Sequence, residues 1–377
     1  MKRTADAIIV GAGIIGCSTA YHLAKMGVTD VILLERDRVG AGASSQSAAM
    51  LSLQFCQDEL TVRMARYCYD RYMAFEEELG VSTDFRPTGW MYVATEASAD
   101  RLRQQVAMLQ KAGVSSELLQ PDDVRRLFPE LNTEDIVLGS WGAEDGPFDP
   151  HMIMWGYLRR ARDLGVTVHE GVAVEEILLE DGAVNGVRTD DGPVYSRVVV
   201  NAAGAWAGEI ANGAGLSLPL QNATRSIVVT NPIAAIPHDR PFVEDLEKEW
   251  YVRPEGEGVL MGMGRRPVTE LEIDLDEAQV EAIIDTAMHR LPLLQEASIL
   301  TAWTAVRPMT RDGLPIVGVA GSVPGLIHNC GWGGIGIIMA PLAGQLVAEI
   351  IANGKAQTMD IDPLAPDRPL HNGGSGR

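Results

Sequence analysis

The sequence contains few of the residues that build disulfide frameworks or metal centres. Four of its 377 residues are cysteine and seven are histidine. The cysteines show no CxxC spacing, and the histidines form no HExxH pattern or similar cluster. We therefore expect reduced thiols and no metal site.

Long hydrophobic runs and positive charge are also scarce. No uninterrupted apolar run approaches the roughly 20 residues that a membrane-spanning helix needs. The chain has 31 Lys and Arg against 51 Asp and Glu, a formal net charge of −20, which argues against a nucleic acid or an anionic membrane as a partner. The basic residues at the start precede only a short apolar stretch, which predicts a first strand rather than a signal peptide. We expect a cytoplasmic protein.

The first forty residues do contain a dinucleotide-binding pattern. An apolar run, 7–10, leads into the glycine turn 11–16 and a predicted helix, 14–26, and a second apolar run, 31–34, ends on Glu35. In that pattern Gly11 permits the tight turn, Gly13 lets the backbone approach a pyrophosphate, and Gly16 lets the helix pack on its strand. The helix N-terminus favours the pyrophosphate, and Glu35 suits a ribose hydroxyl. These features predict a bound adenine dinucleotide.

The strand–helix alternation is interrupted twice along the chain. A small-residue loop follows at 40–50, and the next predicted elements are helices 59–79 and 97–112 and strand 89–93. The alternation resumes near residue 150, changes again to short strands and the helix 276–290, and ends with strand 326–329, a glycine loop and helix 337–352. We predict a dinucleotide domain (1–55, 146–215 and 302–357), an inserted domain (56–145 and 216–301) and a tail (358–377) disordered from Pro363.

Three motifs in this order resemble the D-amino-acid oxidase superfamily of FAD enzymes, which includes glycine oxidase and sarcosine oxidases. They are the N-terminal fingerprint, the run from Val199 to Trp206, and the loop Gly331–Gly336 followed by Ala340 and Pro341. The resemblance extends to about residue 355. It implies an α/β fold with a Rossmann-like domain of glutathione-reductase type. It also implies an inserted α+β substrate domain built on a mixed, largely antiparallel sheet.

The resemblance implies an oxidoreductase in which the flavin N5 accepts a hydride from the carbon beside an amine, giving an imine that hydrolyses. The substrate would be a small amino acid or N-substituted amino acid. We expect non-covalent FAD, because the positions that link flavin in relatives hold Arg307, Gln46 and Pro150, with a histidine only next door at His151. The expected cofactor-binding residues are Gly11, Gly13, Ile14, Ile15, Gly16, Glu35, Arg36, Ser44, Ser45, Gln46, Ala48, Ala49, Met50, Val174, Ala202, Ala203, Gly204, Trp206, Arg307, Gly333, Gly334, Ile335, Gly336 and Ile337.

Four residues are candidates for contact with the substrate. The resemblance implies that Arg307 holds a substrate carboxylate in a two-point grip and that Tyr251 binds the same carboxylate, while Met50 and Trp332 wall the cavity. Simpler interpretations remain open: Arg307 in an ion pair with Asp312, Tyr251 as a core aromatic, and plain packing for Met50 and Trp332.

Two other functions remain open. One is a flavin subunit of a multi-subunit amine or opine dehydrogenase complex, and the other is an α-hydroxy-acid dehydrogenase. The electron acceptor, O2 or an electron carrier, is left open as well. So are a homo-oligomer and partner subunits.

Overall fold

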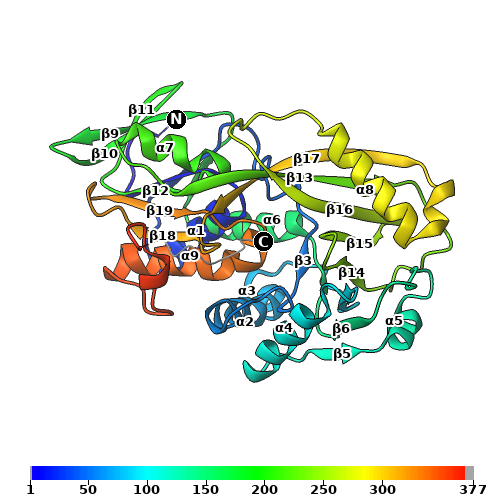
Figure 1. Cartoon of the computed structure of the whole chain (residues 1–377). Helices are drawn as coiled ribbons and strands as arrows, with labels where there is room; N and C mark the ends of the chain where they lie inside the picture. The colour runs from blue at the N-terminus through cyan, green and yellow to red at the C-terminus, as the bar shows by residue number, and fades with distance from the viewer. Residues whose placement is uncertain (1, 370–377) are drawn as a thin grey trace.

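The computed structural model describes residues 2–369 and contains two large sheets (Figure 1). The first has six strands in the order β18-β19-β12-β1-β2-β8, all parallel to their neighbours except β18. Their bounds are β1 Ala7–Val10, β2 Val31–Leu34, β8 Thr167–His169, β12 Val199–Asn201, β18 Ile316–Val319 and β19 Leu326–Cys330. Segments far apart in the sequence therefore meet in one sheet.

Both faces of this sheet are covered because successive side chains of its strands point in opposite directions. Ile9 and Leu33 face a core shared with helices α1 (Ile14–Lys25), α2 (Glu59–Met73), α6 (Pro150–Asp163) and α9 (Gly336–Asn353). Ile8 and Ile32 face the small sheet of β9 (Val174–Glu180), β10 (Ala183–Thr189) and β11 (Gly192–Tyr195). The strands read as continuous apolar runs for this reason.

Helix α9 contains Pro341, which has no N–H to give to the carbonyl of Ile337 one turn earlier. The hydroxyl of Tyr72, on α2, donates a hydrogen bond to that carbonyl instead. The hydroxyl of Ser18, on α1, donates to the carbonyl of Ala340 at 2.6 Å. Three helices from distant parts of the chain are thus joined around the proline.

The second sheet has eight strands in the order β17-β13-β16-β15-β14-β4-β6-β5. Every neighbouring pair is antiparallel except β14 and β4, which confirms the mixed, largely antiparallel sheet expected from the sequence. The bounds are β4 Trp90–Ala94, β5 Glu117–Leu119, β6 Leu138–Gly142, β13 Leu220–Thr230, β14 Phe242–Asp245, β15 Trp250–Glu255, β16 Gly258–Pro267 and β17 Ile299–Thr310.

The two faces of the large sheet have different neighbours. On one face, residues such as Val228 and Met261 pack against helix α8 (Glu277–Arg290). On the other face, Trp90, Phe242 and Tyr251 form a second cluster together with Met50. Met50 belongs to the short strand β3 (Met50–Leu51), which pairs with β7 (Gly146–Pro147).

Most helices lie where the sequence predicts them, with some differences. The predicted helix 59–79 is divided at Ala74 into α2 and α3 (Phe75–Leu79), whereas α4 (Ala99–Lys111) is continuous. The predicted disorder from Pro363 is wrong for residues 363–369. Leu364 is fully buried, and the Arg368 guanidinium makes two hydrogen bonds to the Asp312 carboxylate, at 2.8 and 2.9 Å. The rest of the predicted tail, 370–377, lies outside the described residues.

Helix α9 is long and apolar enough to cross a membrane by length and composition alone. However, 72% of its residues are buried inside the fold, as in the core helix of a globular protein.

Within residues 2–369 no group of three or more His, Cys, Asp or Glu side chains could hold a metal ion.

The remaining elements are short. They are α5 (Pro121–Leu127), α7 (Ala207–Gly213), and the 3-10 turns η1 (Gly204–Trp206), η2 (Pro292–Glu296) and η3 (Asp362–Leu364).

A buried ion pair fixes the end of α8 against the large sheet and yields the first prediction. The Arg290 guanidinium donates to Asp245 at 2.8 Å and to Asp135, and both Arg290 and Asp245 side chains are 1% exposed. Arg290→Met leaves a buried carboxylate unpaired and should lower the free energy of unfolding by about 3–5 kcal/mol.

Chemical denaturation measures this change. The control is Arg197→Met, which breaks an ion pair with Glu180 whose side chains are 66% and 53% exposed and should cost less than about 1 kcal/mol. Equal losses in the two variants would contradict the prediction.

Candidate active site

A cavity of about 320 Å³ lies at the carboxyl ends of β1, β2 and β12. It is lined by the glycine turn after β1, by Glu35 after β2, and by Ala202 to Trp206 after β12. In parallel α/β sheets this edge is where dinucleotides bind. The three motifs that the sequence analysis singled out therefore meet at one edge of the six-stranded sheet.

Two glycines of the turn are required by the backbone itself. Gly11 has a φ of +100°, and a Cβ there would lie 2.6 Å from the carbonyl oxygen of Ala202. A Cβ on Gly16 would lie 1.9 Å from the carbonyl oxygen of Gly11. Gly11 therefore permits the turn and Gly16 the close packing of α1, the roles expected from the sequence.

The polar groups around the turn are oriented by the protein. The Glu35 carboxylate accepts hydrogen bonds from the N–H of Ala12 at 2.8 Å and of Asp37 at 3.0 Å. The Ser44 hydroxyl accepts one from the N–H of Ile14 at 2.9 Å. The loop 40–50 is thereby attached to the start of α1. A carboxylate and a helix N-terminus facing one cavity match the ribose and pyrophosphate of a dinucleotide.

The expected cofactor-binding residues are largely brought together. Trp206 and Arg36 lie side by side, with the guanidinium carbon 3.8 Å from the ring centre. Most of the other expected residues line this cavity or the larger one described next. Gly16, Ser45 and Gln46 line neither, and Gln46 instead accepts a hydrogen bond at its carbonyl from the indole N–H of Trp303, at 3.3 Å.

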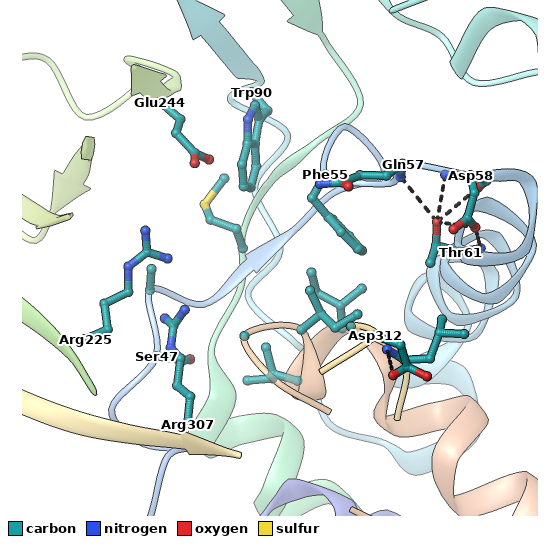
Figure 2. Close-up of a pocket in the computed structure, with 18 of the residues that line it drawn as sticks. Ser47, Phe55, Gln57, Asp58, Thr61, Trp90, Arg225, Glu244, Arg307 and Asp312 are labelled. Atoms are coloured by element: carbon teal, nitrogen blue, oxygen red, sulfur yellow. Dashed lines mark hydrogen bonds between the residues drawn. The ribbon is translucent and has the colours of Figure 1, made fainter. Parts of the chain in front are cut away.

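A second cavity, of about 840 Å³, lies between the large sheet, loop 40–50 and the start of α9. It borders the face of the sheet that carries Trp90, Phe242 and Tyr251. Four residues line both cavities: Ser47, Arg307, Gly334 and Ile337. A dinucleotide bound along the glycine turn would therefore meet the larger cavity at this junction. Trp90, Arg225, Glu244 and Arg307 lie toward one end of the larger cavity, and Asp58, Thr61 and Asp312 toward the other (Figure 2).

Arg307 lies at the junction, on β17. A Cβ on Gly334 would come within 2.7 Å of the Arg307 Nη1 atom, so the guanidinium lies directly against the glycine loop. Burial lowers the pKa of Arg307 to about 10, and the charge of Arg225 adds to this effect. The alternative pairing with Asp312 does not form, because that carboxylate pairs with Arg368.

The other substrate candidates fall in two places. Tyr251 and Met50 line the large cavity, and the Tyr251 hydroxyl has no hydrogen-bond partner within residues 2–369. Trp332 lines the dinucleotide cavity and not the large one. Its indole N–H donates to the Asn329 side chain at 2.9 Å, so its expected place in the wall of the large cavity is not where the structure puts it.

Several residues of the site were missed by sequence reasoning. Arg225 and Glu244 line the large cavity but stand outside any motif. Arg253 is buried, and its Nε donates at 2.8 Å to the carbonyl of Ala48, which attaches loop 40–50 to β15. The sequence does offer one indication of Arg253, because it directly follows Tyr251 and Val252. A charged residue inside a run of buried strand residues needs a hydrogen-bonding or ionic partner.

Residues 6–350 match the family described as FAD dependent oxidoreductase. The chain belongs to this family. The glycine-lined cavity with an oriented carboxylate fits the cofactor, since the residues present would hold its pyrophosphate and ribose. No buried thiol there is activated, because burial raises the pKa of Cys330 to about 12.

Relatives of similar sequence and solved structures of similar fold have different named functions. Mitochondrial sarcosine dehydrogenase of Mus musculus is 29% identical over 376 residues, covering 95% of this chain and 40% of the relative. The mitochondrial pyruvate dehydrogenase phosphatase regulatory subunit of Mus musculus is 30% identical over 369 residues, covering 94% and 42%. The structure of L-proline dehydrogenase from P. horikoshii superposes with a TM-score of 0.88 at 25% identity, covering 97% and 98%. This FAD dependent oxidoreductase thus spans less than half the length of the two mitochondrial relatives.

A buried acid supports the segment that follows Met50 in the cavity wall. Asp145 is 2% exposed, and its Oδ1 accepts a hydrogen bond from the N–H of Leu53 at 3.1 Å. Burial raises the pKa of this carboxyl to about 7. The folded protein holds this proton more tightly than the unfolded chain does. The contribution of Asp145 to the free energy of unfolding therefore falls as the pH rises from about 4 to 7.

Asp145→Asn should remove this dependence. Relative to the parent, the variant should gain in thermal unfolding midpoint when the pH is raised from about 5 to about 8. Thermal denaturation at the two pH values checks it. An offset between the variant and the parent that is the same at both pH values would show that Asp145 does not titrate in this range.

Proposed function

We propose that the protein oxidises the C–N bond of an amino acid or N-substituted amino acid. The observation that carries this proposal is the position of Arg307, a partly buried cation at the point where the dinucleotide cavity opens into the large cavity. No carboxylate within residues 2–369 pairs with this guanidinium, and because leaving a desolvated cation unpaired is costly, a carboxylate-bearing substrate is the natural counterion. The sarcosine dehydrogenase and proline dehydrogenase relatives act, by their names, on such compounds.

FAD in the dinucleotide cavity would supply the two-electron oxidant for the hydride on the carbon beside the nitrogen, with O2 or an electron carrier as the final electron acceptor. The nitrogen lone pair forms the C=N bond as the C–H bond breaks, so the substrate amine must be neutral. Water then adds to the imine. The residues of this chain bind and orient the substrate, and Arg307 with its planar fork would hold the carboxylate so that the reacting carbon faces the junction.

We infer that FAD is held without a covalent bond. His151 is exposed on the first turn of α6 and lines neither cavity. Acid precipitation should leave a colourless pellet, with FAD in the supernatant. A yellow pellet would show a covalent link and overturn this part of the proposal.

The reaction class is tested by anaerobic mixing of the purified FAD-loaded protein with a panel of amino acids, N-methyl amino acids, plain amines and hydroxy acids. Loss of flavin absorbance with an amino acid supports the proposal. Loss only with a hydroxy acid would make the protein a hydroxy-acid dehydrogenase. A similarity to the regulatory subunit favours a second candidate, a binding or regulatory chain, and no reduction by any compound in the panel would support it.

Substitution of Arg307 gives a quantitative prediction. Arg307→Lys keeps the charge but loses the two-donor fork, and should lower kcat/KM for an amino-acid substrate by about tenfold to a thousandfold, or roughly 1.4–4 kcal/mol. FAD content should stay normal. The amine that lacks the carboxylate serves as the matched substrate and should lose much less. Equal losses for the two substrates would assign Arg307 to the fold or to the flavin.

A further inference from the structure

A second arginine, Arg225, extends into the large cavity from β13 (Figure 2). Its guanidinium lies 4.7 Å from the centre of the Tyr251 ring. Its Nη2 donates to the carbonyl of Glu249 at 3.3 Å, a long contact. Its Nε is buried and has no hydrogen-bond partner within residues 2–369. Part of the hydrogen-bonding capacity of this cation is therefore unused by the protein.

The sheet register places Arg225 beside Arg307. Arg225 pairs with Ala305 and Ala223 pairs with Arg307 on the antiparallel strands β13 and β17. Both arginines thus stand on the same face as diagonal neighbours, about 7–8 Å apart, with somewhat less between their Cβ atoms. Their guanidinium groups have different surroundings, since that of Arg307 lies against Gly334 and that of Arg225 lies against Tyr251, toward Glu244 and Trp90 (Figure 2).

The two cations repel each other in this enclosed space. Arg225 lowers the Arg307 pKa more than Tyr251 raises it, and Arg265 lowers it more than Glu244 raises it. The surroundings of Arg307 therefore keep an excess of positive charge. A substrate with a single carboxylate compensates one of the two guanidinium groups, whereas a substrate with two carboxylates compensates both.

We propose that Arg225 binds a second carboxylate of the substrate, which makes the substrate an amino acid with a further acid group on its side chain or on its nitrogen. This inference rests on the proposed function, in which Arg307 binds the first carboxylate. Arg225 is then a specificity-determining residue. The Tyr251 ring and the Glu249 carbonyl contact its guanidinium, and the side chain lines the cavity in which the second carboxylate would bind.

Binding of inert acids tests the proposal without turnover. The probes are propionate and butyrate against succinate and glutarate, titrated into the FAD-loaded protein while the flavin absorbance is followed. In the parent, the better dicarboxylate should bind at least about tenfold more tightly than its matched monocarboxylate, because a second charge-assisted contact forms. Arg225→Gln should abolish that advantage and leave monocarboxylate binding within about twofold. Arg225→Lys should retain part of it.

Arg266→Gln is the matched control. Arg266 is on the neighbouring strand β16 and pairs with Asp276 with a side chain that is 57% exposed, outside the cavity. This substitution removes the same charge as Arg225→Gln and should leave the binding of both classes of acid unchanged. Thermal midpoints and FAD-to-protein ratios check that all variants are folded and loaded.

Three results would overturn the proposal. They are no preference for dicarboxylates in the parent, equal weakening of both acid classes in Arg225→Gln, and equal weakening by the control Arg266→Gln. The second result would assign Arg225 to the first carboxylate or to support of Tyr251.

Anaerobic reduction separates this inference from the proposed function. Acidic amino acids, N-carboxyalkyl amino acids, glycine and sarcosine are compared as reductants, and the pattern also shows whether the second acid group sits on the side chain or on the nitrogen. A dicarboxylate preference that depends on Arg225, without reduction by any amine, would support the binding site and refute the proposed reaction. Reduction by sarcosine and glycine alone, without a dicarboxylate preference, would support the proposed reaction and refute the second carboxylate site.

Discussion

The close contact between β17 and the glycine loop before α9 is the constraint on which the site depends. The N–H of Gly333 donates to the carbonyl of Pro308 at 3.0 Å, and the missing side chain of Gly334 leaves room for the Arg307 guanidinium. This contact joins the last strand of the large sheet to the helix that covers the six-stranded sheet. The two cavities meet at the same point, so the position of Arg307 relative to a bound dinucleotide follows from backbone geometry.

One end of the large cavity carries a charge opposite to that of the whole chain. A formal net charge of −20 repels anionic ligands at long range, and salt weakens that repulsion. At this end of the cavity, two arginines on neighbouring strands outnumber the single carboxylate of Glu244. Affinity for an acid must therefore come from short contacts with these guanidinium groups and not from the overall field.

The sequence could predict the parts of the fold that depend on local pattern. The glycine turn, Glu35 and the helix boundaries follow from spacing and periodicity, and the structure has them close to the predicted positions. Strand β17 was not recognised, because Ile299–Thr310 mixes apolar, polar and charged residues and is only partly buried. Arg225 was missed for a related reason, since only the register of β13 against β17 places it beside Arg307, 82 positions away.

The disorder predicted from Pro363 failed because composition reports only local tendency. Residues 363–369 are held by contacts to distant segments: Leu364 is buried in the main core, and Arg368 pairs with Asp312 in the turn after β17. These residues border the cavity end that is remote from Arg225. There the cation Arg368 is neutralised by Asp312, and Asp58 accepts a hydrogen bond from the N–H of Thr61 as the cap of α2. Because these charges near Asp312 are engaged within the protein, the proposed discrimination among acids would rest on the opposite end of the cavity, where Arg225 and Arg307 lie.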